Sequence, residues 1–449
     1  MPVLLVIVLL VSHSAVTASS IFLVAAESPA AKAYKLGHFE EVLRLLEQET
    51  SSKKEPSREL LRLACLSHLR LGHSEDAAAL YMRLHPVGQA DDTGLLRELA
   101  LTTIMSRVRD PQEHVRIAAY TALAELGRVD LLPVLEDGLL DSSALVRARA
   151  AEAIGKTGAA GRSAALKRSL RDEAPGVRIA VINAFDAKAA GISEELTNIA
   201  RIDTGPESIF ALAGLYKLGR RDVLDDITSA VTLPNPEVRM AAIGILGKLR
   251  KPSSLAILSQ AVYDPAPPVR AFAAGALGDF GSPDGVAPLT HALGDEHARV
   301  RGIAATSLGR LGISETRSVL QPLLRDPAEQ VRAGAVEGLL RLGDTSAFLV
   351  AADLARHPDP SVRGAIAQAL SATSNTKALP LLDSLLRDQQ PLPRLMAARA
   401  LGKTGLRNAV SSLKTGLRDT DAAVRITAAG SVLSLLETRR SKSPGKGSG

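Results

Sequence analysis

Residues 264–281 read DPAPPVRAFAAGALGDFG, and Asp264 lies six residues before Arg270. The same arrangement recurs along the chain, almost always at an interval of 31 residues. The recurring Arg, which follows Val in every copy but one, occupies these positions: Arg116, Arg147, Arg178, Arg239, Arg270, Arg301, Arg332, Arg363, Arg394 and Arg425. A further copy, centred on Ser208 with one residue deleted, completes eleven repeats. A period in this range predicts a stack of similar helical units.

Each repeat predicts two helices. Asp followed by Pro is expected to cap the first helix, with Pro at the first helical position. A Gly eleven residues after the Arg position predicts a left-handed C-terminal cap. It stands at Gly127, Gly158, Gly219, Gly281, Gly312, Gly343 and Gly405. Apolar residues 19 and 23 after the Arg, such as Leu289 and Leu293, lie on one face of a second helix.

These residues resemble the D-P-x-x-x-V-R-x-x-A-x-x-A-L-G-x-L-G motif of the short HEAT-like repeats named after phycobilin lyases. The resemblance covers about residues 105–437. It implies an all-α, right-handed solenoid of antiparallel helix pairs, with the second helices on the concave side. At about 10 Å per pair, such an array would be about 110 Å long. The last copy lacks a clear second helix, so RITAAGSVLSLLE at 425–437 is expected to cap the array.

The resemblance also implies a structural role for the recurring Asp and Arg, as a hydrogen-bonded ladder between neighbouring repeats. Six residues apart, the two do not meet within one helix. A catalytic pair repeated eight times would also make no chemical sense. The ladder residues are Asp110, Arg116, Asp141, Arg147, Asp172, Arg178, Asp264, Arg270, Asp295, Arg301, Asp326, Arg332, Asp388, Arg394, Asp419 and Arg425.

Residues 27–104 precede the array. Gly37 and Gly72, 35 residues apart, each follow Leu and precede an acidic turn and an amphipathic helix. This pattern resembles tetratricopeptide repeats, and a plain helical cap is the alternative. At the other end, residues 438–449 are rich in Ser, Gly and basic side chains and are expected to form a disordered basic tail.

Residues 1–26 begin with an apolar run from Val3 to Val11 and then become small and polar. This pattern predicts a signal peptide and an exported protein, periplasmic or extracellular. The n-region contains no Lys or Arg, so an uncleaved membrane anchor and a buried first helix are the alternatives.

Composition and charge argue against several function classes. The formal net charge is +6, but four of these charges lie in the last eleven residues, so the body of the chain is nearly neutral. Aromatic residues make up 3% of the chain. Nucleic-acid binding is therefore the least favoured function, because a nucleic-acid groove needs a basic stripe, often with stacking aromatics.

No catalytic, cofactor or metal site is expected from the sequence. Cys65 lies in an apolar segment and is interpreted as a core residue. His68, His73 and His85 are interpreted as exposed histidines at helix turns, since intervals of five and twelve do not form an i,i+4 zinc pair. The chain contains no His-Glu dipeptide, such as binds iron in HEAT-like deoxyhypusine hydroxylases, and no phosphate-binding loop or nucleophile elbow.

The predicted function is a non-catalytic scaffold that binds another protein or peptide along the concave face. The polar positions of the second helices predict the binding residues, namely Thr228, Ser229, Ser259, Gln260, Thr290, His291 and Gln321. The alternative is a lyase-like or chaperone-like accessory that holds a tetrapyrrole or another prosthetic group, by analogy with the family that named the repeat.

The repeat pattern is irregular at one place. Ser208 replaces Arg, and Leu233 replaces the Asp of the following repeat. An interrupted ladder is therefore expected near residues 203–238, with a local change of curvature or a hinge.

The first test concerns residues 1–26. If they are a signal peptide, protein isolated from the cells that produce it will begin after Ala18 or Ala26, where small residues form cleavage motifs. Intact-mass measurement and N-terminal sequencing check this. Recovery of the full chain from the cytoplasm would contradict export.

Overall fold

The computed structural model describes residues 27–189 and 191–441, and the predicted leader lies outside this part. The described residues form α-helices joined by turns and short 3-10 helices, and no strand is found among them. None of the described helices is both long and apolar enough to cross a membrane. The chain is thus an α-solenoid over the part that the structure describes.

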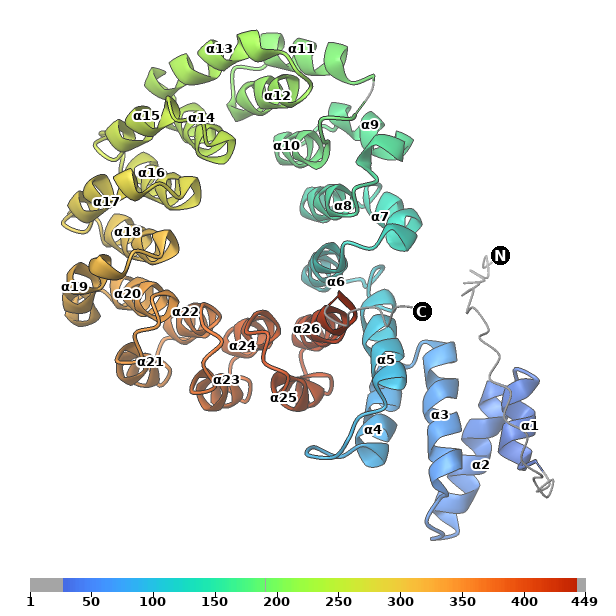
Figure 1. The fold of residues 1–449 in the computed structure, drawn as a ribbon. Helices are drawn as coiled ribbons and strands as arrows, with labels where there is room; N and C mark the ends of the chain where they lie inside the picture. The colour runs from blue at the N-terminus through green and yellow to red at the C-terminus, as the bar shows by residue number, and fades with distance from the viewer. Residues whose placement is uncertain (1–26, 190, 442–449) are drawn as a thin grey trace, which may run out of the picture.

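The first helices of the repeats form one layer. They are α6 (Glu113–Leu126), α8 (Ala144–Lys156), α10 (Pro175–Ala184), α12 (Pro206–Lys217), α14 (Pro236–Leu249), α16 (Pro267–Phe280), α18 (Ala298–Leu311), α20 (Glu329–Arg341), α22 (Pro360–Leu370), α24 (Pro391–Lys403) and α26 (Ala422–Ser441). Each packs against the next, and α26 packs against α6. The array therefore closes into a ring, and these helices form its inner layer (Figure 1).

The second helices form the outer layer of the ring (Figure 1). They are α7 (Leu132–Gly138), α9 (Ala164–Arg168), α11 (Ser193–Ile202), α13 (Leu224–Ser229), α15 (Ser254–Ala261), α17 (Val286–Ala292), α19 (Arg317–Leu320), α21 (Ala347–Leu354), α23 (Ala378–Leu385) and α25 (Ala409–Gly416). The 3-10 helices flank them: η1 (Val129–Leu131), η2 (Ala160–Arg162), η3 (Ser169–Arg171), η4 (Arg221–Val223), η5 (Ala230–Thr232), η6 (Pro283–Gly285), η7 (Ser314–Thr316) and η8 (Gln321–Arg325). The expectation that the second helices line the concave side is wrong, because the first helices occupy that side (Figure 1).

Close packing of the inner helices explains why they lie inside. A Cβ atom added to Gly278 of α16 would lie 2.7 Å from Cβ of Ser307 in α18, and one added to Gly247 of α14 would lie 3.0 Å from Cβ of Ala276. Glycine at these positions lets neighbouring backbones approach. When two layers of helices bend together, the layer whose neighbouring helices lie closer to one another is on the inside of the curve.

The Arg side chains of the inner helices connect consecutive repeats. Arg301 donates to both carboxylate oxygens of Asp326, through Nε at 3.0 Å and Nη2 at 2.9 Å, and its Nη1 donates to the carbonyl of Asp295 at 2.8 Å. Six more pairs have the same two-bond geometry: Arg116–Asp141, Arg147–Asp172, Arg239–Asp264, Arg270–Asp295, Arg363–Asp388 and Arg394–Asp419. We call these seven pairs the Asp–Arg ladder.

The Asp six residues before the motif Arg does not act as the helix N-cap, so the prediction from Asp-Pro is wrong for these residues, although Asp359, which precedes Pro360, does cap α22. Asp326 Oδ1 accepts from the N–H of Ala328 at 2.9 Å, and α20 begins at Glu329. The carboxylate closes a turn just before the helix, where it also faces the Arg of the preceding repeat. Burial would raise the pKa of Asp326, but the bonds from Arg301 and Ala328 outweigh burial, so its pKa is lowered.

The left-handed glycines are found as predicted. All seven predicted C-terminal caps have positive φ, from 59° at Gly127 to 103° at Gly219. Arg250 takes this position in the repeat of Arg239 and has φ of 49°. Glycine adopts this conformation without strain, so it ends most inner helices abruptly.

The ladder is interrupted at three boundaries. Arg178 bonds to Glu207 at 3.0 Å, because the carboxylate of Asp203, its counterpart in the next repeat, lies 3.8 Å away. Ser208 is too short to reach the next repeat. His357 replaces the Asp that Arg332 would meet, and Arg332 bonds to Glu329 of its own helix instead. The ladder is therefore interrupted on both sides of α12, and the hinge there stays a prediction.

The N-terminal region comprises α1 (Pro29–Lys35), α2 (Phe39–Ser51), α3 (Arg58–Leu71), α4 (Ser74–Leu84) and α5 (Thr93–Met105). Gly37 and Gly72, with φ of 78° and 79°, end α1 and α3. Helices α1, α2 and α3 extend away from the ring, whereas α5 packs against α26, and α4 lies beside α5 (Figure 1). The assignment to tetratricopeptide repeats stays a prediction.

Contacts between α25–α26 and residues 75–125 close the ring, and we call them the ring seam. Lys414 is 1% exposed, and its Nζ donates to Asp91 Oδ1 at 2.7 Å and to the carbonyl of His85 at 3.0 Å. Arg425, the last motif Arg, bonds to Glu75 at 2.6 Å. Gly430 of α26 lies directly against Ala122 of α6. α26 thus caps the array and also joins its two ends, and it continues to Ser441, four residues beyond the predicted end of the array.

The ladder predicts that replacing two motif Arg residues, one with and one without an Asp partner, lowers the free energy of unfolding by different amounts. Arg301→Ala should destabilise the array by about 3 kcal/mol, because it leaves the buried Asp326 without its charged partner. Arg332→Ala, the matched control, should cost about 1 kcal/mol, because Arg332 has no carboxylate across the boundary. Urea unfolding followed by circular dichroism, with hydrogen exchange of α18 and α20, measures both. Equal destabilisation would contradict this role of the ladder.

The ring seam predicts an effect of Lys414 on closure. Lys414→Met should increase hydrogen exchange in α25, α26 and α5, because Asp91 and two carbonyls lose their donor. Lys377→Met, on the exposed N-terminal side of α23, is the control and should leave exchange unchanged. If hydrogen exchange in α25, α26 and α5 is the same in both variants, Lys414 does not hold the two ends of the array together.

Candidate functional site

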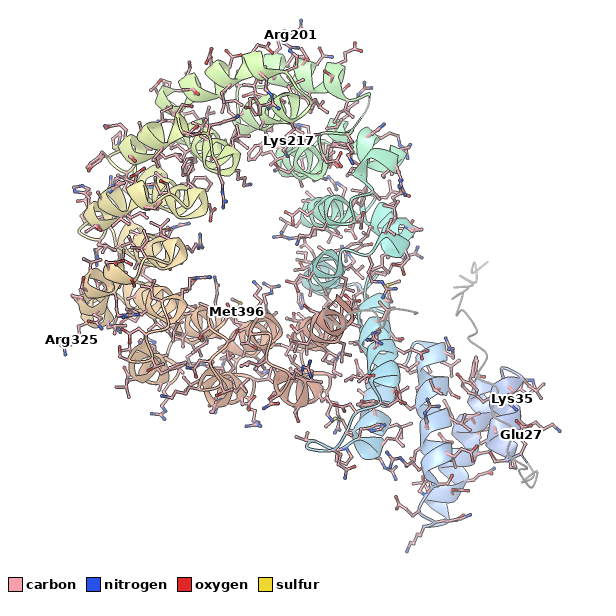
Figure 2. The ribbon with its side chains drawn as sticks, in the orientation of Figure 1. Glu27, Lys35, Arg201, Lys217, Arg325 and Met396 are labelled. Atoms are coloured by element: carbon pink, nitrogen blue, oxygen red, sulfur yellow. The ribbon has the colours of Figure 1, made fainter. Side chains whose placement is uncertain are left out.

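The surface of the inner helices that faces the middle of the ring is the candidate functional site, and we call it the inner surface. On an inner helix, the residues two, five and nine after the motif Arg share one face, because intervals of three and four place them there. Figure 2 shows Met396 and Lys217, at the second and ninth positions, on the inner side of the ring. Arg201 and Arg325 lie on the outside (Figure 2).

The predicted partner-binding residues lie elsewhere. Thr228 and Ser229 belong to α13, Ser259 and Gln260 to α15, Thr290 and His291 to α17, and Gln321 to η8, all in the outer layer. Their expected place on the concave side is therefore wrong. The prediction assigned them to the wrong layer, because a helical period identifies a face of a helix but not the side to which the whole layer bends.

An apolar patch lies on the inner surface of α12, α14, α16 and α18. We define the inner apolar patch as Phe210, Met240, Phe272 and Ile303, which line a hollow of about 470 Å³. Phe272 is 46% exposed although it is a large apolar residue. Its ring lies over Gly244, where an added Cβ would be 2.7 Å from the ring. Glycine thus makes room for an aromatic side chain that remains open to solvent.

A second, more polar hollow of about 400 Å³ follows on α18, α20 and α22. Gly302 and Gly334 line it but are buried within α18 and α20. The side chains of Gln330, Glu337 and Gln368 therefore supply its polar groups. The two hollows are adjacent, since Arg299 and Ile303 line both.

Basic side chains border the inner apolar patch. At the position nine after the motif Arg, six charged residues are basic and two are acidic: Lys156, Lys217, Lys248, Arg310, Arg341, Lys403, Glu125 and Asp279. Basic residues are favoured at helix C-termini by the helix dipole, which explains part of this excess. Arg310 is paired with Asp279 at 3.0 Å.

Three of the basic side chains near the patch are unpaired. Within the described residues, Lys217, Lys248 and Arg299 have no ion pair within 4.0 Å. Burial lowers the pKa of Lys217, and the nearby charge of Lys248 lowers it further. An acidic group placed here would offset the repulsion between these cations.

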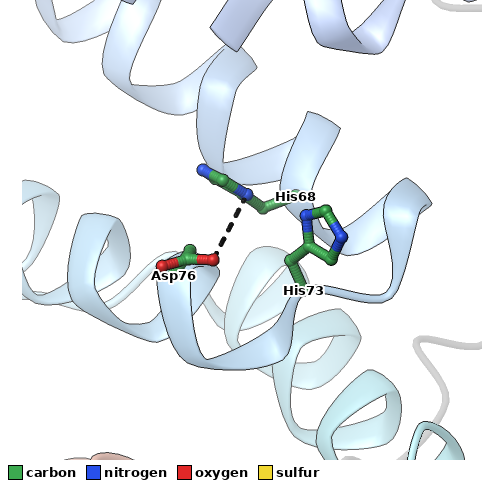
Figure 3. Close-up of side chains that lie close together, drawn as sticks. All are labelled: His68, His73 and Asp76. Atoms are coloured by element: carbon green, nitrogen blue, oxygen red, sulfur yellow. Dashed lines mark ion pairs between the residues drawn. The ribbon is translucent and has the colours of Figure 1, made fainter. Parts of the chain in front are cut away.

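Cys65 and the histidines occupy different environments. Cys65 is buried, and burial raises its pKa to about 12, so it is a core thiol as predicted. His68, His73 and Asp76 lie close together at the turn between α3 and α4 (Figure 3). His68 is largely buried, which corrects the prediction of an exposed histidine, and burial lowers its pKa. The spacing argument missed this group because Gly72 reverses the chain between His68 and His73.

Among the comparisons with known proteins, one family model matches much of the chain. The family model for HEAT repeats matches residues 100–186, 206–268, 256–340 and 317–392. No curated protein sequence matches the chain. Among solved structures, the complex of CpcE and CpcF of phycocyanin lyase from Nostoc sp. PCC7120 is similar, with 23% identity, a TM-score of 0.36, and coverage of 47% of this chain and 94% of that one.

Two further solved structures are similar. Human deoxyhypusine hydroxylase in complex with glycerol has 20% identity and a TM-score of 0.26, covering 50% of this chain and 99% of that one. YibA from E. coli has 19% identity and a TM-score of 0.30, covering 66% of this chain and 98% of that one. On the family match, which spans most of the ring, the chain belongs to the HEAT-repeat family.

Proposed function

We propose that the protein is a scaffold that binds a segment of another protein along its inner surface. The inner apolar patch would receive apolar side chains of the segment, and Lys217, Lys248 and Arg299 would pair with its acidic groups. HEAT repeats generally mediate interactions between proteins, and a long surface gains affinity from many weak contacts.

The observation that carries this proposal is the exposed side chain of Phe272 beside unpaired cations. An open aromatic residue of this size is costly in water and is typical of the centre of a binding site. The adjacent hollow, with the polar side chains of Gln330, Glu337 and Gln368, extends the surface along α18, α20 and α22, as an extended peptide requires. A partner segment that alternates apolar and acidic residues fits both features.

The alternative is an accessory that holds a tetrapyrrole or another prosthetic group. The same patch would accept an apolar ring, and the same cations would pair with its carboxylates. Nucleic-acid binding has less support, because the unpaired cations surround an apolar hollow and do not form a continuous stripe. Both alternatives lead to distinct experimental outcomes.

The test uses a photo-crosslinking amino acid at position 272, and at position 349 on the outer helix α21 as a control. Leu349 is also apolar and is 80% exposed. We expect position 272 to crosslink to one protein segment that contains apolar and acidic residues, and position 349 not to do so. Phe272→Asp should weaken binding of a synthetic peptide of that segment by at least about 10-fold, whereas Leu349→Asp should not.

The cations provide a second arm of the same experiment. The double variant Lys248→Glu, Arg299→Glu should also weaken peptide binding, whereas Lys377→Glu, just before α23, should not. Crosslinks at position 349 alone, or peptide binding insensitive to Phe272→Asp, would contradict the proposal. A coloured purified protein would favour the prosthetic-group alternative. Crosslinks to nucleic acid, together with binding that weakens steeply as salt is added, would favour nucleic-acid binding.

A further inference from the structure

The turn between α3 and α4 brings two imidazoles and a carboxylate together. α3 ends at Leu71, Gly72 takes φ of 79°, and the N–H of His73 donates to the carbonyl of His68 at 2.8 Å. This turn places the His68 and His73 rings 5.8 Å apart between centroids. Asp76, in the first turn of α4, places Oδ2 at 3.9 Å from Nδ1 of His68 (Figure 3).

The three side chains have the composition and spacing of a metal site. One ligand atom from each lies within 4.8 Å of the other two. In a tetrahedral zinc site, bonds of about 2.1 Å place ligand atoms roughly 3.4 Å apart. Because His73 and Asp76 are exposed, small rotations of their side chains can close this difference.

His68 supplies an independent indication of a missing partner. Its Nδ1 is buried and has no hydrogen-bond partner among the described residues. A buried polar atom left in this state typically costs about 1–3 kcal/mol. The atom faces the Asp76 carboxylate, at a distance too long for a hydrogen bond. A metal ion between them would bind both the His68 nitrogen and the Asp76 carboxylate.

We propose that His68, His73 and Asp76 bind one divalent transition-metal ion of the zinc class. Two imidazole nitrogens and one carboxylate oxygen are ligands that zinc accepts, and a water molecule would complete the coordination. This inference does not rest on the proposed function, because the site lies outside the ring and far along the chain from the inner apolar patch.

Metal binding would have a structural consequence. The ligands come from both sides of the turn, so the ion would fix α3 to α4. Glu75, next to Asp76, bonds to Arg425 at the ring seam and to Arg107 at 2.6 Å. The ion would therefore stabilise the helix that the ring seam uses.

The experiment uses the full chain without a histidine tag and Co²⁺ or Zn²⁺ alone. Titration calorimetry and the visible absorption of Co²⁺ should show one site per chain. His73→Ala and Asp76→Asn are exposed substitutions that leave the core intact, and each should weaken binding at least about 10-fold, since even outer groups of metal sites contribute that much. His114→Ala, an exposed histidine of α6, is the matched control.

Added Zn²⁺ should also raise the thermal midpoint of the wild-type chain and leave that of His73→Ala unchanged. Circular dichroism checks that the variants are folded. The proposal is wrong if the wild-type chain binds neither ion at tens of micromolar, or if His73→Ala and Asp76→Asn bind as the wild type does.

Discussion

The bond between a motif Arg and the Asp of the next repeat is the interaction on which the array depends. Each guanidinium spans three points, namely both oxygens of one carboxylate and a carbonyl of its own repeat, as Arg301 does with Asp326 and Asp295. A planar donor with fixed geometry sets both the distance and the angle between neighbouring units. Repetition of this bond along the chain gives the ring a regular curvature.

The seam shows how a repetitive chain ends. A solenoid usually leaves an apolar face at each end, which must be capped. Here α26 fills both ends at once, because it packs against α24 on one side and α5 and α6 on the other. The buried Lys414 and the pair of Arg425 with Glu75 use residues from opposite ends of the chain. Closure of the ring covers the apolar faces of the first and last repeats. It also makes the inner surface face the middle of the ring.

The inner surface differs from the outer one in chemistry. Glycines such as Gly244 and Gly334 allow close helix packing and also leave hollows, so the same residues produce the curvature and the candidate site. Outer positions such as Thr228 and Gln321 have the small polar character of an ordinary solvated face. The sequence pattern did not predict the inner apolar patch as the binding site. A signal was present, because Phe272 occupies a position where most repeats have smaller residues.

The amino-acid sequence by itself determined the repeat length, the helix pairs and the left-handed glycines, because each depends on residues at fixed intervals. The resemblance to HEAT-like repeats implied the ladder between neighbouring units, and the structure showed at which boundaries it forms. Tertiary structure alone decided which layer lies inside, whether the array closes, and that His68, His73 and Asp76 meet. Which layer lies inside depends on how closely the helices are spaced within each of the two layers. Closure of the ring depends on the sum of eleven small rotations between neighbouring repeats. No local pattern encodes such a sum, so Lys414 and Asp91, 323 residues apart, could be joined only in three dimensions.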